Sequence, residues 1–209
     1  MQLQDVIDDL RGATFKSVPE QERADTAKRF IERCGYAAAG LTLLPVPFSD
    51  VLAVVPLHVA MIMGISEIHE RPVTRDSATE LALKIATASG LSLIGRRIGT
   101  AVTKALLPGL GGLLAAPSMY AQTIALGAVA RCWFERGEEL SDVEIKTIVA
   151  RVVNDAKDAY DPARAAAEAE AKRRSDPAAR LEKLKELKEK GLIDQAEHDE
   201  QKKRILAEL

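Results

Sequence analysis

The sequence predicts an all-α protein: a helical bundle with two proline- and glycine-hinged apolar hairpins, followed by a C-terminal helical hairpin. Aromatic residues make up only 4% of the 209 residues, so the core must be aliphatic. An aliphatic, alanine-rich composition favours close helix–helix packing over a sheet. Apolar residues recur at helical spacing between cap signals. The chain divides into an arm (1–17), a bundle body (18–160), a charged linker (161–175) and a terminal hairpin (176–209).

In the first half of the body, the sequence predicts two helices joined by a proline turn. The first helix should start at Pro19, because proline suits the first helical turn. Pro45 and Pro47 must end it. Ser49 or Asp50 then caps the second helix.

The second half predicts a similar arrangement. Ser77 and Glu80 form a capping box, and Gly90 ends that helix. A helix over 91–107 follows, and the turn over 108–112 separates it from a long helix that ends near Arg136. We therefore assign the structural hinges and caps of the two hairpins to Pro45, Pro47, Asp50, Pro108 and Gly109.

A second capping box, Ser141 with Glu144, begins the last helix of the body, and Leu140 and Ile145 are spaced as a hydrophobic staple. Beyond residue 160 the chain becomes alanine and charge without an apolar face. That pattern is typical of a solvated helix or a semi-rigid linker.

The terminal hairpin carries a leucine stripe, a glycine stop and a second capped helix. A unit this small has a small core, so burial against another copy or a partner would stabilise it. The residues that we expect to mediate oligomerisation or interaction are Leu181, Leu184, Leu187, Leu192, Ile193, Ile205 and Leu206.

Two long runs of the body are nearly free of charge. Residues 34–66 contain only Asp50 as a formal charge, and residues 105–130 contain none. A membrane-spanning helix needs about 20 apolar residues, and the proline turns divide these runs into shorter pieces. We therefore favour a soluble or membrane-peripheral bundle. Insertion of the hairpins into a bilayer, or exposure of one apolar side for self-assembly, stays open.

No catalytic, cofactor or metal site can be named. The glycine-rich stretch 109–112 is not followed by the Gly-Lys-Ser/Thr of a nucleotide loop. His58 and His69 would lie about 16 Å apart along one helix, too far to share an ion. The two cysteines lack metal-ligand spacing, and a net charge of −2 argues against nucleic acid as a partner.

The terminal hairpin closely resembles the short C-terminal domain called SHOCT. The match rests on the leucines, the Lys190-Gly191-Leu192-Ile193 turn and the closing Ile205-Leu206. His198 stands where the family usually has an aromatic residue. The resemblance implies an oligomerisation or interaction appendage.

The body resembles the YcjF-like helical domain of unknown function that is associated with Era-like GTPases. The shared residues are the stretches 45–50, 61–63 and 65–68, the Pro108-Gly109 turn and the stretch 125–127. The Tyr-Gly pair that the family usually has near His69 is missing. The resemblance implies membrane proximity and a GTPase partner, and it implies no catalytic residue.

Together these features predict a non-catalytic interaction or scaffold protein, without a cofactor, that is membrane-associated or self-assembling. We expect a homo-oligomer, with a GTPase or other protein and a membrane surface as further partners. We expect it in the cytoplasm, peripheral to the inner membrane. The alternatives are an integral membrane module and a lipid-binding protein.

Overall fold

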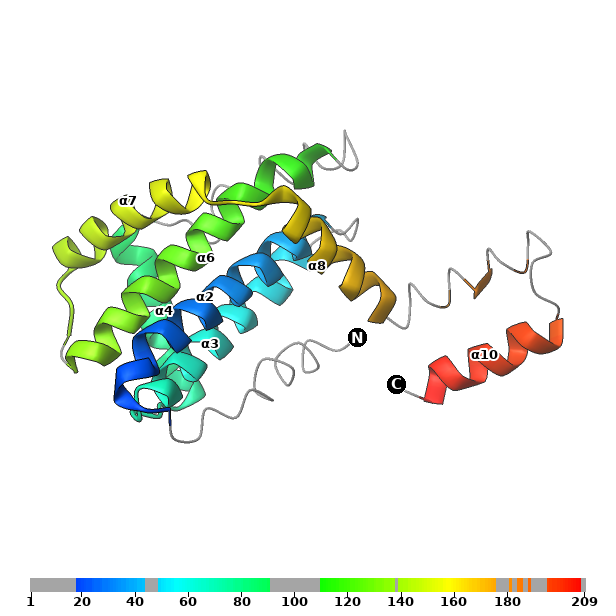
Figure 1. Ribbon diagram of the computed structural model, residues 1–209, viewed down its shortest axis with the longest axis horizontal. Helices are drawn as coiled ribbons and strands as arrows, with labels where there is room; N and C mark the ends of the chain where they lie inside the picture. The colour runs from blue at the N-terminus through cyan, green and yellow to red at the C-terminus, as the bar shows by residue number, and fades with distance from the viewer. Residues whose placement is uncertain are drawn as a thin grey trace.

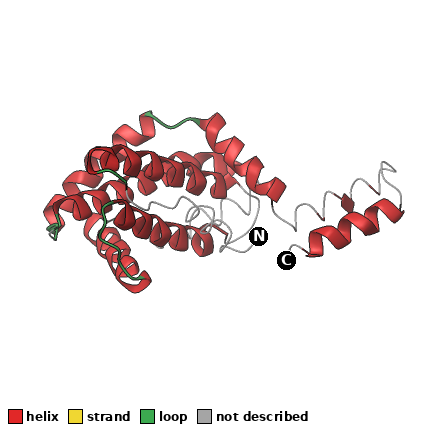
Figure 2. Ribbon diagram, turned by 60° about the horizontal axis from the view of Figure 1, so that its bottom comes forward, coloured by secondary structure: helices red, strands yellow, loops and turns green. Residues whose placement is uncertain are grey.

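The computed structural model describes residues 18–43, 49–90, 110–137 and 139–175, and in the tail residues 181, 184, 185, 188 and 195–207. All regular structure among these residues is helical (Figure 2), which confirms the all-α prediction. The helices are α2 (Glu20–Leu43), α3 (Ser49–Ile68), α4 (Arg75–Ser89), α6 (Leu110–Arg136), α7 (Asp142–Asp158), α8 (Pro162–Ser175) and α10 (Gln195–Ala207).

The bundle is built around α2 and α6, which run in opposite directions and contact each other along much of their length (Figure 1). α3 packs against both of these helices. α4 packs against α3, α6 and α7, and α7 also packs against α6. α2 ends, and α3 and α6 begin, at the same end of the bundle (Figure 1). We call this end the hinge end. Residues 44–48 and 91–109, which precede α3 and α6 in the chain, lie outside the described residues.

The core is aliphatic, as the composition predicts, and its largest fully buried side chains include Leu57, Ile62, Ile65, Leu126 and Ile145. Close approach of α2 and α6 depends on one glycine from each helix. An added Cβ at Gly35 would lie 2.8 Å from Ile124, and one at Gly127 would lie 2.6 Å from Ile31. Each glycine therefore makes room for a side chain of the opposite helix.

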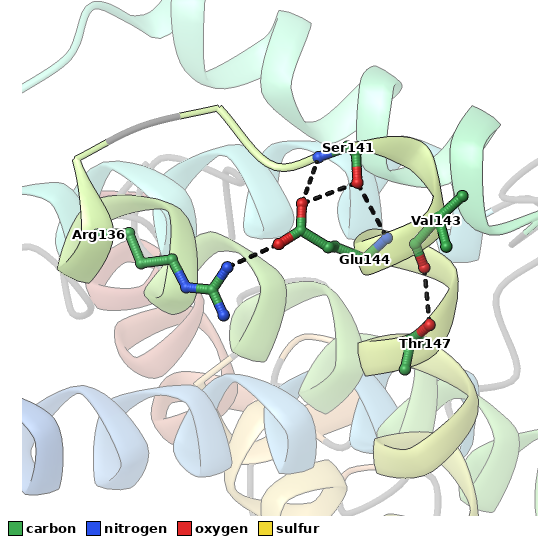
Figure 3. Close-up of polar contacts among 5 residues, drawn as sticks. All are labelled: Arg136, Ser141, Val143, Glu144 and Thr147. Carbon is green, nitrogen blue, oxygen red and sulfur yellow. Dashed lines mark hydrogen bonds and ion pairs between the residues drawn. The ribbon is translucent and has the colours of Figure 1, made fainter.

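The caps are partly as predicted. Gly90 ends α4 in the left-handed conformation, and Ser141 and Glu144 form the expected capping box of α7 (Figure 3). The predicted Ser77–Glu80 box is wrong. Thr74 is the N-cap of α4, because its side chain accepts the Ser77 backbone N–H, which places Ser77 inside the helix.

The hinges are described only at their edges. Pro45, Pro47, Pro108, Gly109 and the predicted helix over 91–107 lie outside the described residues. α3 begins at Ser49, so Asp50 is in its first turn, and its side chain is not described. α6 begins at Leu110, which corrects the prediction of a turn that runs to Gly112.

The segment predicted as a solvated linker instead packs against the body. α8 contacts the C-terminal half of α2, and Ala165 and Ala169 are buried. Gly40 of α2 permits the contact, since an added Cβ there would lie 3.1 Å from the Ala169 nitrogen and 3.4 Å from the Ala165 oxygen. The sequence does not predict this contact of Ala165 and Ala169, because alanines bury little apolar area and give no strong periodic signal.

Candidate functional site

The predicted interaction residues of the tail are partly buried within the chain. Leu184 and Ile205 are buried, and Leu181 is half-buried. Leu206 is 46% exposed, which leaves it free to contact another molecule. Leu187, Leu192 and Ile193 lie outside the described side chains.

A cluster of aromatic side chains lies where α8 meets the bundle. It contains all three tyrosines of the chain: Tyr36 of α2, Tyr120 of α6 and Tyr160 of the turn before α8. The ring centroids of Tyr36 and Tyr120 are 4.5 Å apart, and those of Tyr120 and Tyr160 are 5.5 Å apart. Small side chains fill the space around the rings: Ala39, Ala116, Ala121, Ala156 and Ala165.

Two polar ties connect this tyrosine cluster to the start of α8. The Asp161 backbone N–H donates to the Tyr36 hydroxyl at 3.3 Å. The Arg164 guanidinium lies over the Tyr36 ring, 4.1 Å from its centroid, and forms an ion pair with Glu32 at 2.5 Å. The Asp161 carboxylate also accepts the backbone N–H of Ala163, so it caps α8 while its own amide holds Tyr36.

Burial raises the pKa of two tyrosines of the cluster, Tyr120 and Tyr160. The pKa of Tyr120 is raised further by the Tyr36 phenol beside it and by Glu32. Both phenols are therefore protonated at neutral pH and are poor proton acceptors. The cluster offers rings and hydroxyl groups for packing and hydrogen bonding, with no activated nucleophile.

The sequence does not predict this cluster. The three tyrosines are far apart along the chain, and Arg164 lay in a segment assigned to solvent. The sequence offers one indication of it. The chain has only three tyrosines, and each stands in or beside a stretch of alanines.

The two histidines of α3 and its C-terminal turn are both buried. His58 is buried between α3 and α6, with Nε2 2.9 Å from the Thr123 hydroxyl, which donates to the Met119 carbonyl. His69 is buried just beyond α3. Its Nε2 makes no hydrogen bond with the described part of the chain. Over the same residues, no three histidine, cysteine or carboxylate side chains gather as metal ligands.

The end of the bundle opposite the hinge end carries ion pairs. Arg23 at the start of α2 pairs with Glu70 at 2.6 Å, and Arg136 at the end of α6 pairs with Glu144 at 2.8 Å (Figure 3). At the hinge end, α2 ends and α6 begins in uncharged sequence, and the Arg164–Glu32 ion pair joins α8 to α2. None of the described helices is both long enough and apolar enough to span a bilayer.

A shallow groove of about 250 Å³ lies between α4 and the last turn of α6. Leu81, Trp133 and Phe134 line it, and the Lys84 ammonium lies 4.8 Å from the Trp133 ring centroid. Lys84 also pairs with Glu139 across the groove at 3.0 Å. Both partners line the groove, and its lining presents no group that singles out a ligand.

The comparison with family models decides the classification of the body. The model described as a domain of unknown function, DUF697, matches residues 8–158, which is more than half of the chain. The chain belongs to the DUF697 family. The match begins inside the segment that we expected to be a separate arm. The model described as a short C-terminal domain, SHOCT, matches residues 179–206. Both resemblances inferred from the sequence are thereby confirmed, since DUF697 is the YcjF-like domain.

This DUF697 protein is also similar to a curated protein, "Magnetosome membrane protein 22" of Magnetospirillum gryphiswaldense. The two are 28% identical over 118 residues, which cover 54% of this chain and 60% of the relative. The chain thus spans less than two thirds of the length of that relative. No solved structure matches the chain. Neither family description names a catalytic activity.

Proposed function

We propose that this DUF697 protein is a non-catalytic interaction protein that binds a membrane surface through the hinge end of its body and self-associates through its SHOCT tail. The observation that carries the proposal is the polarity of the bundle. The end of α2 and the beginnings of α3 and α6 lie at one end, and the Arg23–Glu70 and Arg136–Glu144 ion pairs lie at the other. A relative whose name places it in a membrane supports the same function.

The binding is proposed to be peripheral, at the cytoplasmic face of the inner membrane. Between the described helices, residues 91–109 contain Arg96, Arg97 and Lys104 and no acidic residue. A local excess of positive charge next to apolar side chains favours anionic lipid. A GTPase is proposed as a protein partner, on the family resemblance alone.

Flotation with lipid vesicles tests the membrane function. The purified full chain should float with vesicles of phosphatidylcholine and phosphatidylglycerol in equal parts, and less with phosphatidylcholine alone. Added salt should weaken the binding, because it screens the attraction to lipid headgroups. A chain that floats with neither kind of vesicle, and that is absent from the membrane fraction of cells, would contradict the proposal.

Carbonate extraction separates peripheral binding from inserted hairpins. A peripheral protein should be released from membranes at high pH without detergent. Retention in the pellet would instead favour the integral alternative.

Light scattering tests the role of the tail. The full chain should have a mass in solution that is a multiple of its monomer mass, whereas a chain that ends at Ser175, which keeps α8 with the body, should have the mass of its monomer. The same number of chains per particle in both proteins would show that the tail does not drive association.

A further inference from the structure

α8 covers a surface of the bundle that would otherwise be apolar and aromatic. Beneath it lie Tyr36, Ala39 and Gly40 of α2, next to the partly buried Leu43. Tyr36 is only 2% exposed and Ala39 is fully buried. This covered surface is continuous with the end of α2, which runs into the first uncharged stretch of the chain.

The cover is held by few and small contacts. Its buried side chains among the described residues of α8 are two alanines, whereas α2 buries twelve residues, including Phe30, Ile31 and Leu41. Both partners of the Arg164–Glu32 ion pair are partly exposed, at 45% and 39%. Exposed ion pairs contribute little and are weakened by salt. Helices with few buried apolar contacts are the ones that open most easily.

The chemistry of the covered surface fits the boundary between lipid and water. Tyrosine presents an apolar ring and a polar hydroxyl, and it is enriched where proteins meet that boundary. The small residues around Tyr36 are uncharged, and Glu32, the partner of Arg164, is the acidic side chain beside them. α8 lies beside the hinge end (Figure 1), which is the end that the proposed function directs toward the membrane.

We infer that α8 is a displaceable cover: when the protein binds lipid, α8 leaves α2 and the membrane surface takes its place over Tyr36, Ala39 and Gly40. This inference rests on the proposed membrane function and adds a mechanism to it. Because α8 leads directly into the SHOCT tail, its displacement couples membrane binding to the position of the tail.

A disulfide that fixes α8 to α2 tests the inference on the full chain. An added Cβ at Gly40 would lie 3.2 Å from the Cβ of Glu168, and a disulfide needs about 3.5–4.5 Å, so a small shift closes the bond. The test protein carries Gly40→Cys and Glu168→Cys together with Cys132→Ala. Cys34 is fully buried and is kept. The matched control carries Gly40→Cys and Cys132→Ala and cannot form the bridge.

The measurement is flotation with the mixed phosphatidylcholine and phosphatidylglycerol vesicles, before and after reduction. We expect the oxidised double-cysteine protein to bind about tenfold more weakly than its reduced form, since the bridge removes the open state. The control should bind equally in both conditions. Arg164→Ala, which removes both contacts of that side chain, should strengthen binding.

The remaining outcomes are distinguishable. Equal flotation of the oxidised and reduced forms would refute the cover and leave the membrane function standing. Failure of every variant to float would refute both. If the reduced protein or Arg164→Ala forms a dimer without vesicles and does not float, a second copy takes the place of α8, and lipid as the occupant is wrong.

Discussion

Two glycines in the left-handed conformation differ in their surroundings at the scale of single residues. Gly137 (φ 73°) lies beneath the Arg71 guanidinium, which an added Cβ would overlap. Gly90 (φ 66°) has nothing within 4 Å of an added Cβ. Comparing substitutions at the two glycines therefore separates the cost of backbone strain from the cost of steric crowding.

We predict that Gly137→Ala and Gly90→Ala each lower the free energy of unfolding by about 1 kcal/mol, the cost of a left-handed alanine. The two losses should be similar because Arg71 is exposed and its guanidinium can move aside. Urea denaturation measures both values. A much larger loss for Gly137→Ala, relieved by Arg71→Ala, would mean that Arg71 is held in place.

The burial of His69 leads us to predict that the free energy of unfolding depends on pH. Burial lowers the pKa of His69; Glu135 opposes this effect, whereas Arg23, Arg131 and Arg71 add to it. The unfolded chain therefore binds a proton near pH 6.5 while the folded chain does not. Stability should be unaffected by this group above that pH and should fall as the pH drops toward the lower folded pKa.

Urea titrations at a series of pH values test this prediction. His69→Gln should show a weaker fall in the free energy of unfolding below pH 6.5. If the variant and the wild-type protein fall in parallel, another group is responsible.

At the scale of elements, α7 offers a cap and an internal control. Ser141 accepts the Glu144 backbone N–H at 3.3 Å, and the Glu144 carboxylate accepts the Ser141 N–H at 2.9 Å (Figure 3). Ser141→Ala should lower the free energy of unfolding by about 1 kcal/mol, because it leaves a helix-terminal N–H without its acceptor. Chemical denaturation measures the loss.

Thr147 is the matched control on the same helix. Its hydroxyl donates to the Val143 carbonyl one turn earlier (Figure 3) and supports no cap. Thr147→Ala should be neutral or slightly stabilising, since alanine has the higher helix propensity. An equal loss for both variants would argue against a special role of the cap.

The elements also show how far the sequence determines the fold. Strong local signals were sufficient for α2, for the end of α4 at Gly90 and for the Ser141–Glu144 box of α7. The prediction of Ser77 as the N-cap was wrong because Thr74, three residues earlier, offers an equivalent hydroxyl. Local sequence does not show which of two candidate N-caps one turn apart begins the helix. The packing of α8 could not be predicted, because it depends on the fit of Ala165 and Ala169 against Gly40.

At the scale of the whole molecule, the body extends past residue 160 to include α8. The tyrosine cluster was beyond prediction, since it joins residues that are more than 80 positions apart in α2 and α6. What sequence reasoning supplied was the architecture, both families and the two uncharged runs. What it lacked was the pairing of helices, which brings the end of α2 and the beginnings of α3 and α6 to one end of the bundle.

Truncation tests the revised boundary. A chain that ends at Ser175 should unfold with nearly the stability of the full chain. One that ends at Tyr160 should lose about 2 kcal/mol, because it gives up the Arg164–Tyr36 contact and the burial of two alanines. Thermal unfolding followed by circular dichroism compares them. Equal melting temperatures would mean that α8 does not stabilise the body and serves as a linker.

The placement of the aromatic rings makes the molecule its own optical probe. The single tryptophan, Trp133, lies under Lys84 beside α4, while all three tyrosines lie together where α8 meets the bundle. Tyrosine absorbance and tryptophan emission therefore report from separate regions of one chain, without any label. A lifted α8 would alter the tyrosine spectrum and leave the tryptophan emission unchanged, whereas global unfolding would alter both.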